Sequence, residues 1–195
     1  YLNDLVQNHL PEANTRVSII SFYDTADTVH RFSDSQNRDD ISASIDSMIW
    51  YGGFTNTSSG VQAAIDLFDA ESAPDTEKAI LLLTHNKPTR PIYNPSPCGL
   101  IPDIFQRSIT TLVAGVGDRY LTLGGEAELN CLVQSSDHMT HAASYEADDM
   151  APVTPWVTSN LYPQQGGQTI SEPATLPAVL IGLVGLIAAI RQRRA

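Results

Sequence analysis

The sequence contains few cationic residues. Lysine and arginine together number 11, against 22 aspartates and glutamates, so the net charge at pH 7 is −11. Without the three arginines near the end of the chain, the remaining body carries −14. A body this acidic would be repelled by phosphate backbones and by anionic lipid surfaces. We therefore expect no nucleic-acid partner.

Cysteine is almost absent, and the two that occur are Cys98 and Cys131. No Cys-x-x-Cys pair or Cys/His cluster suggests a zinc site. Two cysteines fit an oxidising compartment, where they could form a disulfide. Two separate buried thiols are the alternative, because the sequence does not give the distance between them.

Common catalytic motifs are also lacking. The glycine-rich stretch is not followed by Gly-Lys-Ser/Thr, which argues against a phosphate-binding loop. No Gly-x-Ser-x-Gly elbow occurs, and the five histidines are scattered with no persuasive Ser/His/Asp arrangement. We therefore expect a protein that is not an enzyme. A non-catalytic module of a larger exported hydrolase remains an alternative.

Short apolar segments alternate with segments of helical periodicity. Runs typical of buried parallel strands, together with a shorter edge strand, occur at residues 16–22, 28–32, 79–84 and 109–116. Apolar residues at helical spacing occur at residues 2–10, 41–49, 61–68 and, more weakly, 129–133. This alternation predicts an α/β fold with a doubly wound, mostly parallel, Rossmann-like sheet over residues 1–150.

Three loops of this body stand out, because ligands of such sheets bind where strands lead into helices. They are Gly-Gly-Phe-Thr-Asn-Thr-Ser-Ser-Gly at 52–60, Thr-His-Asn-Lys-Pro at 84–88 and Gly-Val-Gly-Asp at 115–118. Glycines and hydroxyls at a helix start can cap the helix or favour anions. In this order the three loops, with the strand Arg-Val-Ser-Ile-Ile-Ser-Phe at 16–22, resemble the von Willebrand factor A (VWFA) domain.

The resemblance implies a metal-ion-dependent adhesion site (MIDAS) holding Mg²⁺ or Ca²⁺, with Thr55 at the family's threonine position. His85 stands where the family has an aspartate, and an imidazole suits Zn²⁺, Cu²⁺ or Ni²⁺ better than Mg²⁺. The family's Asp-x-Ser-x-Ser strand does not occur, and no signal peptide begins at Tyr1. We therefore expect an N-terminally truncated domain whose first strand is missing and whose sheet edges are exposed.

The chain ends in a pattern typical of an export signal. Residues 151–170 are rich in Pro, Gln, Gly, Thr and Ser, which predicts a disordered linker. Residues 174–190 carry no charge and predict a single transmembrane helix, oriented by the basic stop that follows. A buried core helix is the alternative. The motif before the span is Ser171, Glu172 and Pro173, and the basic stop is Arg191, Arg193 and Arg194.

Residues 171–195 resemble the PEP-CTERM sorting signal of Gram-negative bacteria, although Ser171 replaces the usual first proline. The resemblance implies processing by an exosortase, an inner-membrane anchor before cleavage, and delivery to the cell surface or extracellular matrix. Together, the two resemblances imply a bacterial surface protein that adheres to a protein or matrix ligand through a weakened metal site. A metal-free structural scaffold of the extracellular matrix is the second alternative.

Overall fold

The computed structural model describes residues 1–10, 15–49, 55–73, 76–85, 96–118, 125–161 and 179–185. The sorting motif at 171–173 and the basic stop at 191–194 lie outside these residues, as does the start of the glycine-rich loop.

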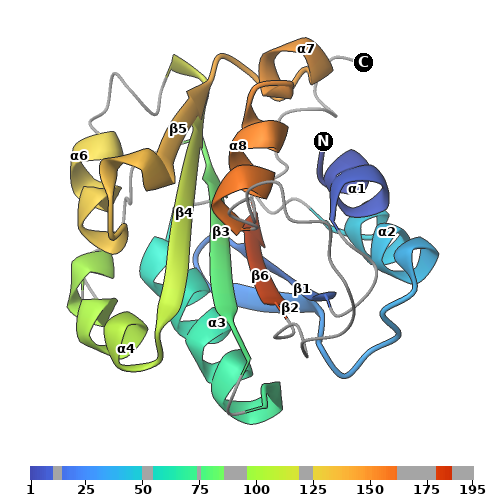
Figure 1. Ribbon diagram of the computed structural model, residues 1–195, viewed down its shortest axis with the longest axis horizontal. Helices are drawn as coiled ribbons and strands as arrows, with labels where there is room; N and C mark the ends of the chain where they lie inside the picture. The colour runs from blue at the N-terminus through green and yellow to red at the C-terminus, as the bar shows by residue number, and fades with distance from the viewer. Residues whose placement is uncertain are drawn as a thin grey trace, which may run out of the picture.

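A six-stranded sheet forms the centre of the described fold (Figure 1). Its strands are β1 Thr15–Phe22, β2 Ala26–His30, β3 Lys78–Thr84, β4 Ile109–Val116, β5 Met139–Ala142 and β6 Val179–Gly185, in the order β2-β1-β6-β3-β4-β5. β2 is antiparallel to β1, and the other neighbours are parallel. The predicted α/β class and mostly parallel sheet are confirmed.

Helices cover both faces of this sheet. Those described are α1 Leu2–Asp4, η1 Leu5–His9, α2 Arg38–Asp46, α3 Thr57–Glu71, η2 Pro97–Leu100, α4 Ile101–Gln106, α6 Gly125–Leu129, η3 Asn130–Leu132, η4 Ser136–His138, α7 Ala147–Met150 and α8 Val153–Leu161. The helix predicted at 41–49 ends earlier, and Ile49 beyond it is 64% exposed.

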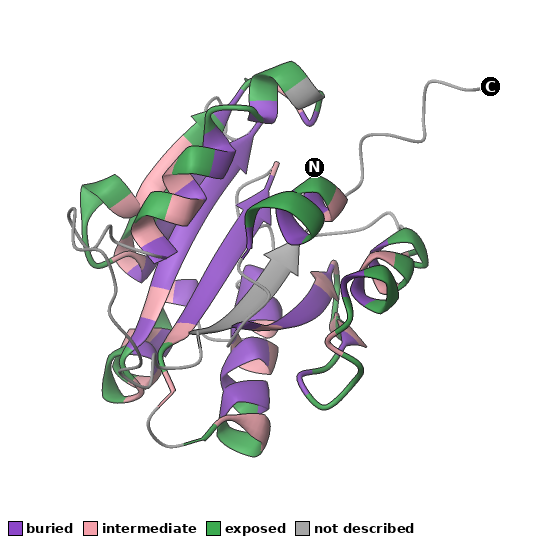
Figure 2. Cartoon of the chain, turned by 45° about the vertical axis from the view of Figure 1, so that its right-hand side comes forward, coloured by how far each residue is buried: buried purple, intermediate pink, exposed green. Residues whose placement is uncertain are grey.

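Strand alternation divides the core into two clusters, one on each face of the sheet. On one face, Leu81 of β3 and Leu112 of β4 share a buried cluster with residues of η1, α2 and α8. On the other face, Ile80 and Leu82 share a cluster with α3, α4 and α6. Figure 2 shows that the coloured strands are mostly buried and that the helices are exposed on their outer sides. Burial on both faces explains why the strands are continuous apolar runs.

The linker predicted for residues 151–170 is corrected over its first half. Val153–Leu161 forms α8, and Val153, Val157 and Leu161 are buried in the first cluster. Their spacing of four residues puts them on one helix face, and Pro155 is tolerated because it lies in the first turn. The high content of polar and turn-forming residues masked this short periodicity. Residues 162–170 lie outside the described part of the chain.

Part of the predicted transmembrane helix has a different structure. Val179–Gly185 forms strand β6, between β1 and β3, and the rest of the 174–190 span lies outside the described residues. A short run of Val, Leu and Ile is compatible both with a strand that is buried on two faces and with an apolar helix. The pattern alone therefore does not distinguish a strand from a helix. Among the described residues, no helix is long and apolar enough to cross a bilayer.

A disulfide joins two short helices beside the sheet. Cys98 of η2 and Cys131 of η3 are bonded, with their Cα atoms 5.5 Å apart. The structure thus gives the pairing that the sequence left open. By loop-closure arguments, a bond that closes a loop of 33 residues stabilises a fold by about 3–4 kcal/mol.

Candidate functional site

The carboxyl ends of three strands meet at one edge of the sheet. Thr84 of β3 pairs with Gly115 of β4, and Val116 pairs with Ala142 of β5, so these strands end almost level. The loops that the sequence singled out at 84–88 and 115–118 therefore begin at this edge, which we call the carboxyl edge. Ligands of doubly wound sheets bind at such edges.

Thr55 is buried in the loop that leads into α3. The next residue, Asn56, fixes this loop. Its side chain accepts a hydrogen bond from the Ser59 amide at 3.1 Å and donates one to the Asp24 carbonyl at 2.9 Å. Its backbone amide donates to the Tyr23 carbonyl at 2.8 Å. One asparagine thus caps α3 and ties its start to the turn after β1, which holds Thr55 at the carboxyl edge.

His85 follows the last residue of β3. Thr84 is fully buried, whereas His85 is half-buried. The histidine that the resemblance assigns to the family's aspartate position thus lies where β3 ends. Thr55 and His85 are both at loops of this edge, but their proposed roles as metal ligands remain predictions.

The loop after β4 is fixed to β5. Gly117 has φ +83°, in the left-handed region that favours glycine, and its amide donates to the Ala142 carbonyl at 2.8 Å. The ring of His141 lies 3.4 Å from the Gly117 carbonyl oxygen. These contacts set the position of Asp118, which is exposed.

The residues described at the carboxyl edge do not fit a Mg²⁺ or Ca²⁺ site. These ions prefer six or more oxygen ligands, with carboxylates among them. Carboxylates do follow strands at this edge, at Asp24 and Asp118, but both are exposed. Within the described ranges, no three His, Cys, Asp or Glu side chains are grouped closely enough to hold a metal ion. The hydroxyl groups of Thr55 and Thr84 and the imidazole of His85 supply no anionic ligand.

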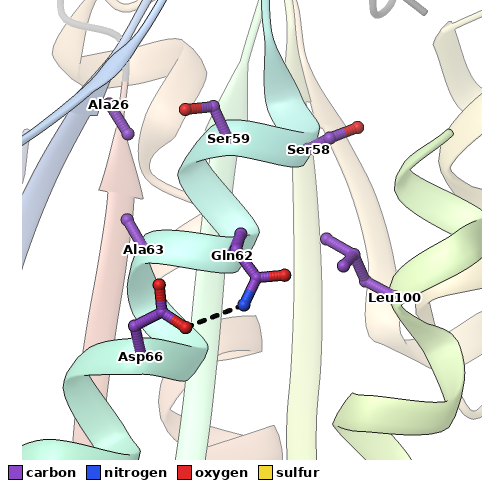
Figure 3. A pocket seen from close by; sticks show the side chains of 7 residues that line it. All are labelled: Ala26, Ser58, Ser59, Gln62, Ala63, Asp66 and Leu100. Atoms are coloured by element: carbon purple, nitrogen blue, oxygen red, sulfur yellow. Dashed lines mark hydrogen bonds between the residues drawn. The ribbon is translucent and has the colours of Figure 1, made fainter. Parts of the chain in front are cut away.

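A shallow hollow of about 240 Å³ lies beside the first turns of α3 (Figure 3). It is lined by Ala26, Ser58, Ser59, Gln62, Ala63, Asp66 and Leu100. The Gln62 amide donates to the Asp66 carboxylate at 2.8 Å, so the two side chains hold each other in place. The hollow offers hydroxyl, amide and carboxylate groups together with the apolar surface of Leu100.

One buried oxygen marks the start of α3. The Thr57 side chain is fully buried, and its hydroxyl has no hydrogen-bond partner among the residues that the structure describes. Leaving a hydroxyl desolvated costs about 1–3 kcal/mol, a cost that buried packing around α3 offsets.

The sequence model of the von Willebrand factor type A domain family matches residues 1–152. The chain belongs to this family. The resemblance inferred from the loops is therefore confirmed for the domain.

Among the solved structures that are similar to this chain is a mussel matrix protein. Proximal thread matrix protein 1 of the mussel byssus matches with a TM-score of 0.69 and 18% identity, over 81% of this chain and 40% of that one. A structure of the same protein with a zinc-occupied MIDAS motif matches with a TM-score of 0.65 and 20% identity, over 80% and 38%. The chain thus spans about two fifths of the mussel protein, and identity this low shows a shared fold. No curated protein matches this chain significantly.

Sequence reasoning missed two buried polar residues, Asn56 at the carboxyl edge and His30 in β2, which lies opposite Ile19 of β1. The hydroxyls beside Asn56 are equally good candidates for the helix cap, so the sequence does not single out this asparagine, although asparagine before a helical run is itself a cap signal. His30 is 2% exposed, and its Nδ1 lies 3.0 Å from the Ser44 hydroxyl of α2. No local pattern reveals that contact, because it depends on how β2 and α2 pack.

Proposed function

We propose that this chain is an exported, non-enzymatic domain that binds a protein or matrix ligand at the carboxyl edge of its sheet. The observation that carries the proposal is the fixed loop around Asn56, which holds Thr55 and the start of α3 beside the turn after β1. A loop fixed before binding loses little conformational entropy when a ligand arrives.

The ligand chemistry follows from the charge and shape of this region. Asp24 and Asp118 are exposed at the edge, and Asp66 lines the adjoining hollow. A ligand with basic side chains would complement these carboxylates and would associate faster at low salt. The hollow beside α3 has room for one such side chain.

We propose that binding at this edge does not depend on a divalent metal, because the described residues lack the grouped carboxylates that Mg²⁺ or Ca²⁺ would need. The mussel protein with its zinc-occupied MIDAS makes Zn²⁺ the ion to test against this view. The imidazoles of His85 and His141 are described side chains at the edge that suit zinc, and His85 is the one at the family's aspartate position.

Adsorption of the labelled full chain to the extracellular matrix of the producing cells tests the proposal. We expect His85→Ala and Gln62→Ala to weaken adsorption about tenfold each, as for residues near the centre of an interface. Glu77→Ala is the matched control, because Glu77 is exposed next to the opposite end of β3. Equal adsorption by all three variants would exclude the carboxyl edge as the binding surface.

A chelator provides the second arm of this experiment. We expect EDTA to leave adsorption unchanged. Loss of adsorption in EDTA, with recovery in Zn²⁺ but not after His85→Ala, would contradict the metal-independent route and would assign zinc to this edge.

We further propose that residues 171–195 act as a sorting signal, processed by an exosortase after temporary anchoring in the inner membrane. The support is the order of Glu172-Pro173, an uncharged span and terminal arginines. Pro173→Ala should leave the uncleaved chain in the membrane fraction, whereas Pro163→Ala, upstream of the motif, should not. Recovery of uncleaved wild-type chain from the cytosol, without lipid association, would contradict this proposal.

A further inference from the structure

The hollow beside α3 has two unlike sides (Figure 3). Gln62 and Asp66, one turn apart on α3, supply polar groups on one side, and Leu100, at the end of η2, forms an apolar wall on the other. Leu100 is only 3% exposed, so this wall belongs to the core. The disulfide between Cys98 of η2 and Cys131 of η3 holds η2 in place. Both sides of the hollow therefore exist before a ligand arrives.

The size of the hollow suits one side chain rather than a whole small molecule. Its volume is about 240 Å³, whereas pockets for drug-sized ligands measure about 300–1,000 Å³. A long side chain would lay its apolar stem against Leu100 and Ala63 and bring a polar head to Gln62 and Asp66. Arginine and lysine are the side chains with such a stem and a charged head.

The charge of the hollow favours a cation. Asp66 carries the one charge in the lining that the structure describes, and this side chain is exposed. Asp66 forms no ion pair within the described part of the chain. The start of α3 would otherwise attract an anion, but the amides of Ser59 and Gly60 already donate to Asn56. An anion would therefore meet a carboxylate and few available donors.

The hydrogen bond between Gln62 and Asp66 distinguishes one cation from another. The Gln62 amide nitrogen donates to one carboxylate oxygen at 2.8 Å. The second carboxylate oxygen and the Gln62 amide oxygen remain as acceptors, and they lie on opposite sides of that hydrogen bond (Figure 3). A guanidinium has five N–H groups spread around a plane, so it can donate to two separated acceptors at once. The ammonium of lysine is a compact and more strongly hydrated charge.

We propose that the hollow is a slot for one arginine side chain of a protein ligand, in which Asp66 selects the positive charge and Gln62 selects the guanidinium. The partner is the ligand of the proposed function, on which this inference rests. The slot adjoins the carboxyl edge through Ser59, which lines the hollow and whose amide is held by the Asn56 cap. An arginine seated in the slot would bring the ligand backbone to that edge.

Capped tripeptides test the slot directly. The probe is acetyl-Gly-Arg-Gly-amide, titrated into the ¹⁵N-labelled full chain. We expect saturable shifts of the backbone amide resonances of Gln62 and Ala63, with a dissociation constant on the order of 1 mM for a single side chain. The peptide with lysine in place of arginine should bind about fivefold more weakly. The peptide with citrulline, which keeps the shape and loses the charge, should bind about tenfold more weakly.

No saturable shift at Gln62 and Ala63 would overturn the proposal. Equal binding of the arginine and citrulline peptides would also overturn it, because the slot would then not select a charge.

Two variants separate the roles of the polar residues. Asp66→Asn should abolish the preference for arginine over citrulline. Gln62→Met should keep that preference and abolish the preference for arginine over lysine. Asp46→Asn is the matched control, because it makes the same change of charge at an exposed position of α2, which packs on the other face of the sheet. Equal weakening by Asp66→Asn and Asp46→Asn would reveal a general effect of net charge and would exclude the slot.

The result can be separated from that of the proposed function. If adsorption to the matrix depends on His85 and Gln62 but the arginine peptide does not bind, binding at the carboxyl edge is supported and the arginine slot is excluded. If the peptide binds in the hollow while adsorption is equal in all variants, the slot is supported and matrix binding at this edge is excluded.

Discussion

The parts of the sheet on either side of β6 are built in different ways. β3, β4 and β5 follow one another along the chain, each parallel to the last, with η2 and η3 joined by a disulfide beside them. β1 and β2 form an antiparallel pair closed by a short turn, in which the Tyr23 amide donates to the Thr25 carbonyl. Both parts pair strands that follow one another in sequence, and among the described strands only β6 pairs with strands remote from it.

Helix α3 links the same two parts from one face. Arg107, after α4, donates to the Asp69 carboxylate, and Arg31, after β2, donates to the Glu71 carboxylate at 2.7 Å. The helix therefore has an ion pair to each part near its end. Between two locally formed units, β6 thus supplies the backbone connection and α3 supplies the side-chain connection.

The largest expected effect is in the β3–β5 part. Leu81→Ala removes a fully buried side chain from β3 and should lower the free energy of unfolding by about 3 kcal/mol. Ile49→Ala, at a residue that is 64% exposed, should change it by less than about 0.5 kcal/mol. Urea denaturation of the two variants measures both values. Similar losses would mean that β3 does not lie in the core.

A pair of asparagine variants gives the next largest effect. Asn37 and Asn56 each cap a helix, but Asn56 also donates to the Asp24 carbonyl after β1. Asn37→Ala should lower the free energy of unfolding by about 1 kcal/mol, and Asn56→Ala should lower it by about 2 kcal/mol. The second value is larger because Asn56→Ala also removes the hydrogen bond to the Asp24 carbonyl. Thermal unfolding measures the difference. Equal costs would remove Asn56 as the residue that fixes the edge.

The smallest effect concerns the two ion pairs of α3. Burial opposes ionisation of Glu71, but hydrogen bonds from Arg31 and Ser33 prevail and lower the pKa of its carboxyl below 4.5. Because its folded-state pKa is lowered, its contribution to stability is present above the unfolded pKa and is lost as pH falls through the folded pKa. Glu71→Gln should therefore lower the free energy of unfolding by about 1 kcal/mol at pH 7, and its difference in stability from the wild type should vanish in acid.

Asp69→Asn is the matched variant for the other part. The hydrogen bond from Arg107 lowers the pKa of Asp69 below 3.8, but its side chain is 49% exposed, against 12% for Glu71. Solvent screens the more exposed Arg107–Asp69 pair, so its loss should lower the free energy of unfolding by no more than about 0.5 kcal/mol. Stability measured from pH 7 to pH 3 gives both curves. A larger effect of Asp69→Asn would reverse our ranking of the two connections.

The elements predicted from sequence are those whose signal is local. Residues 109–116 form a strand within the predicted bounds, because eight residues without charge fit a doubly buried position. The loops at Thr55 and His85 were placed correctly at the carboxyl edge, since parallel strands bring their ends together. These inferences need only neighbouring residues and one topological rule.

The elements that were missed depend on remote contacts. The α8 pattern consists of only three residues, Val153, Val157 and Leu161, and the polar residues around them carried more weight in the prediction. Val179–Gly185 has no property of its own that selects a strand over a helix. Its pairing with β1 and β3 is a contact with remote residues, which no local pattern contains.

Nuclear Overhauser effects from the backbone of Leu183 test the role of β6 most directly. We predict contacts from Leu183 to Ile19 and to Leu81, the residues that align with it in β1 and β3. Contacts from Leu183 to residues three and four positions away along its own segment, with none to Ile19 or Leu81, would contradict the account.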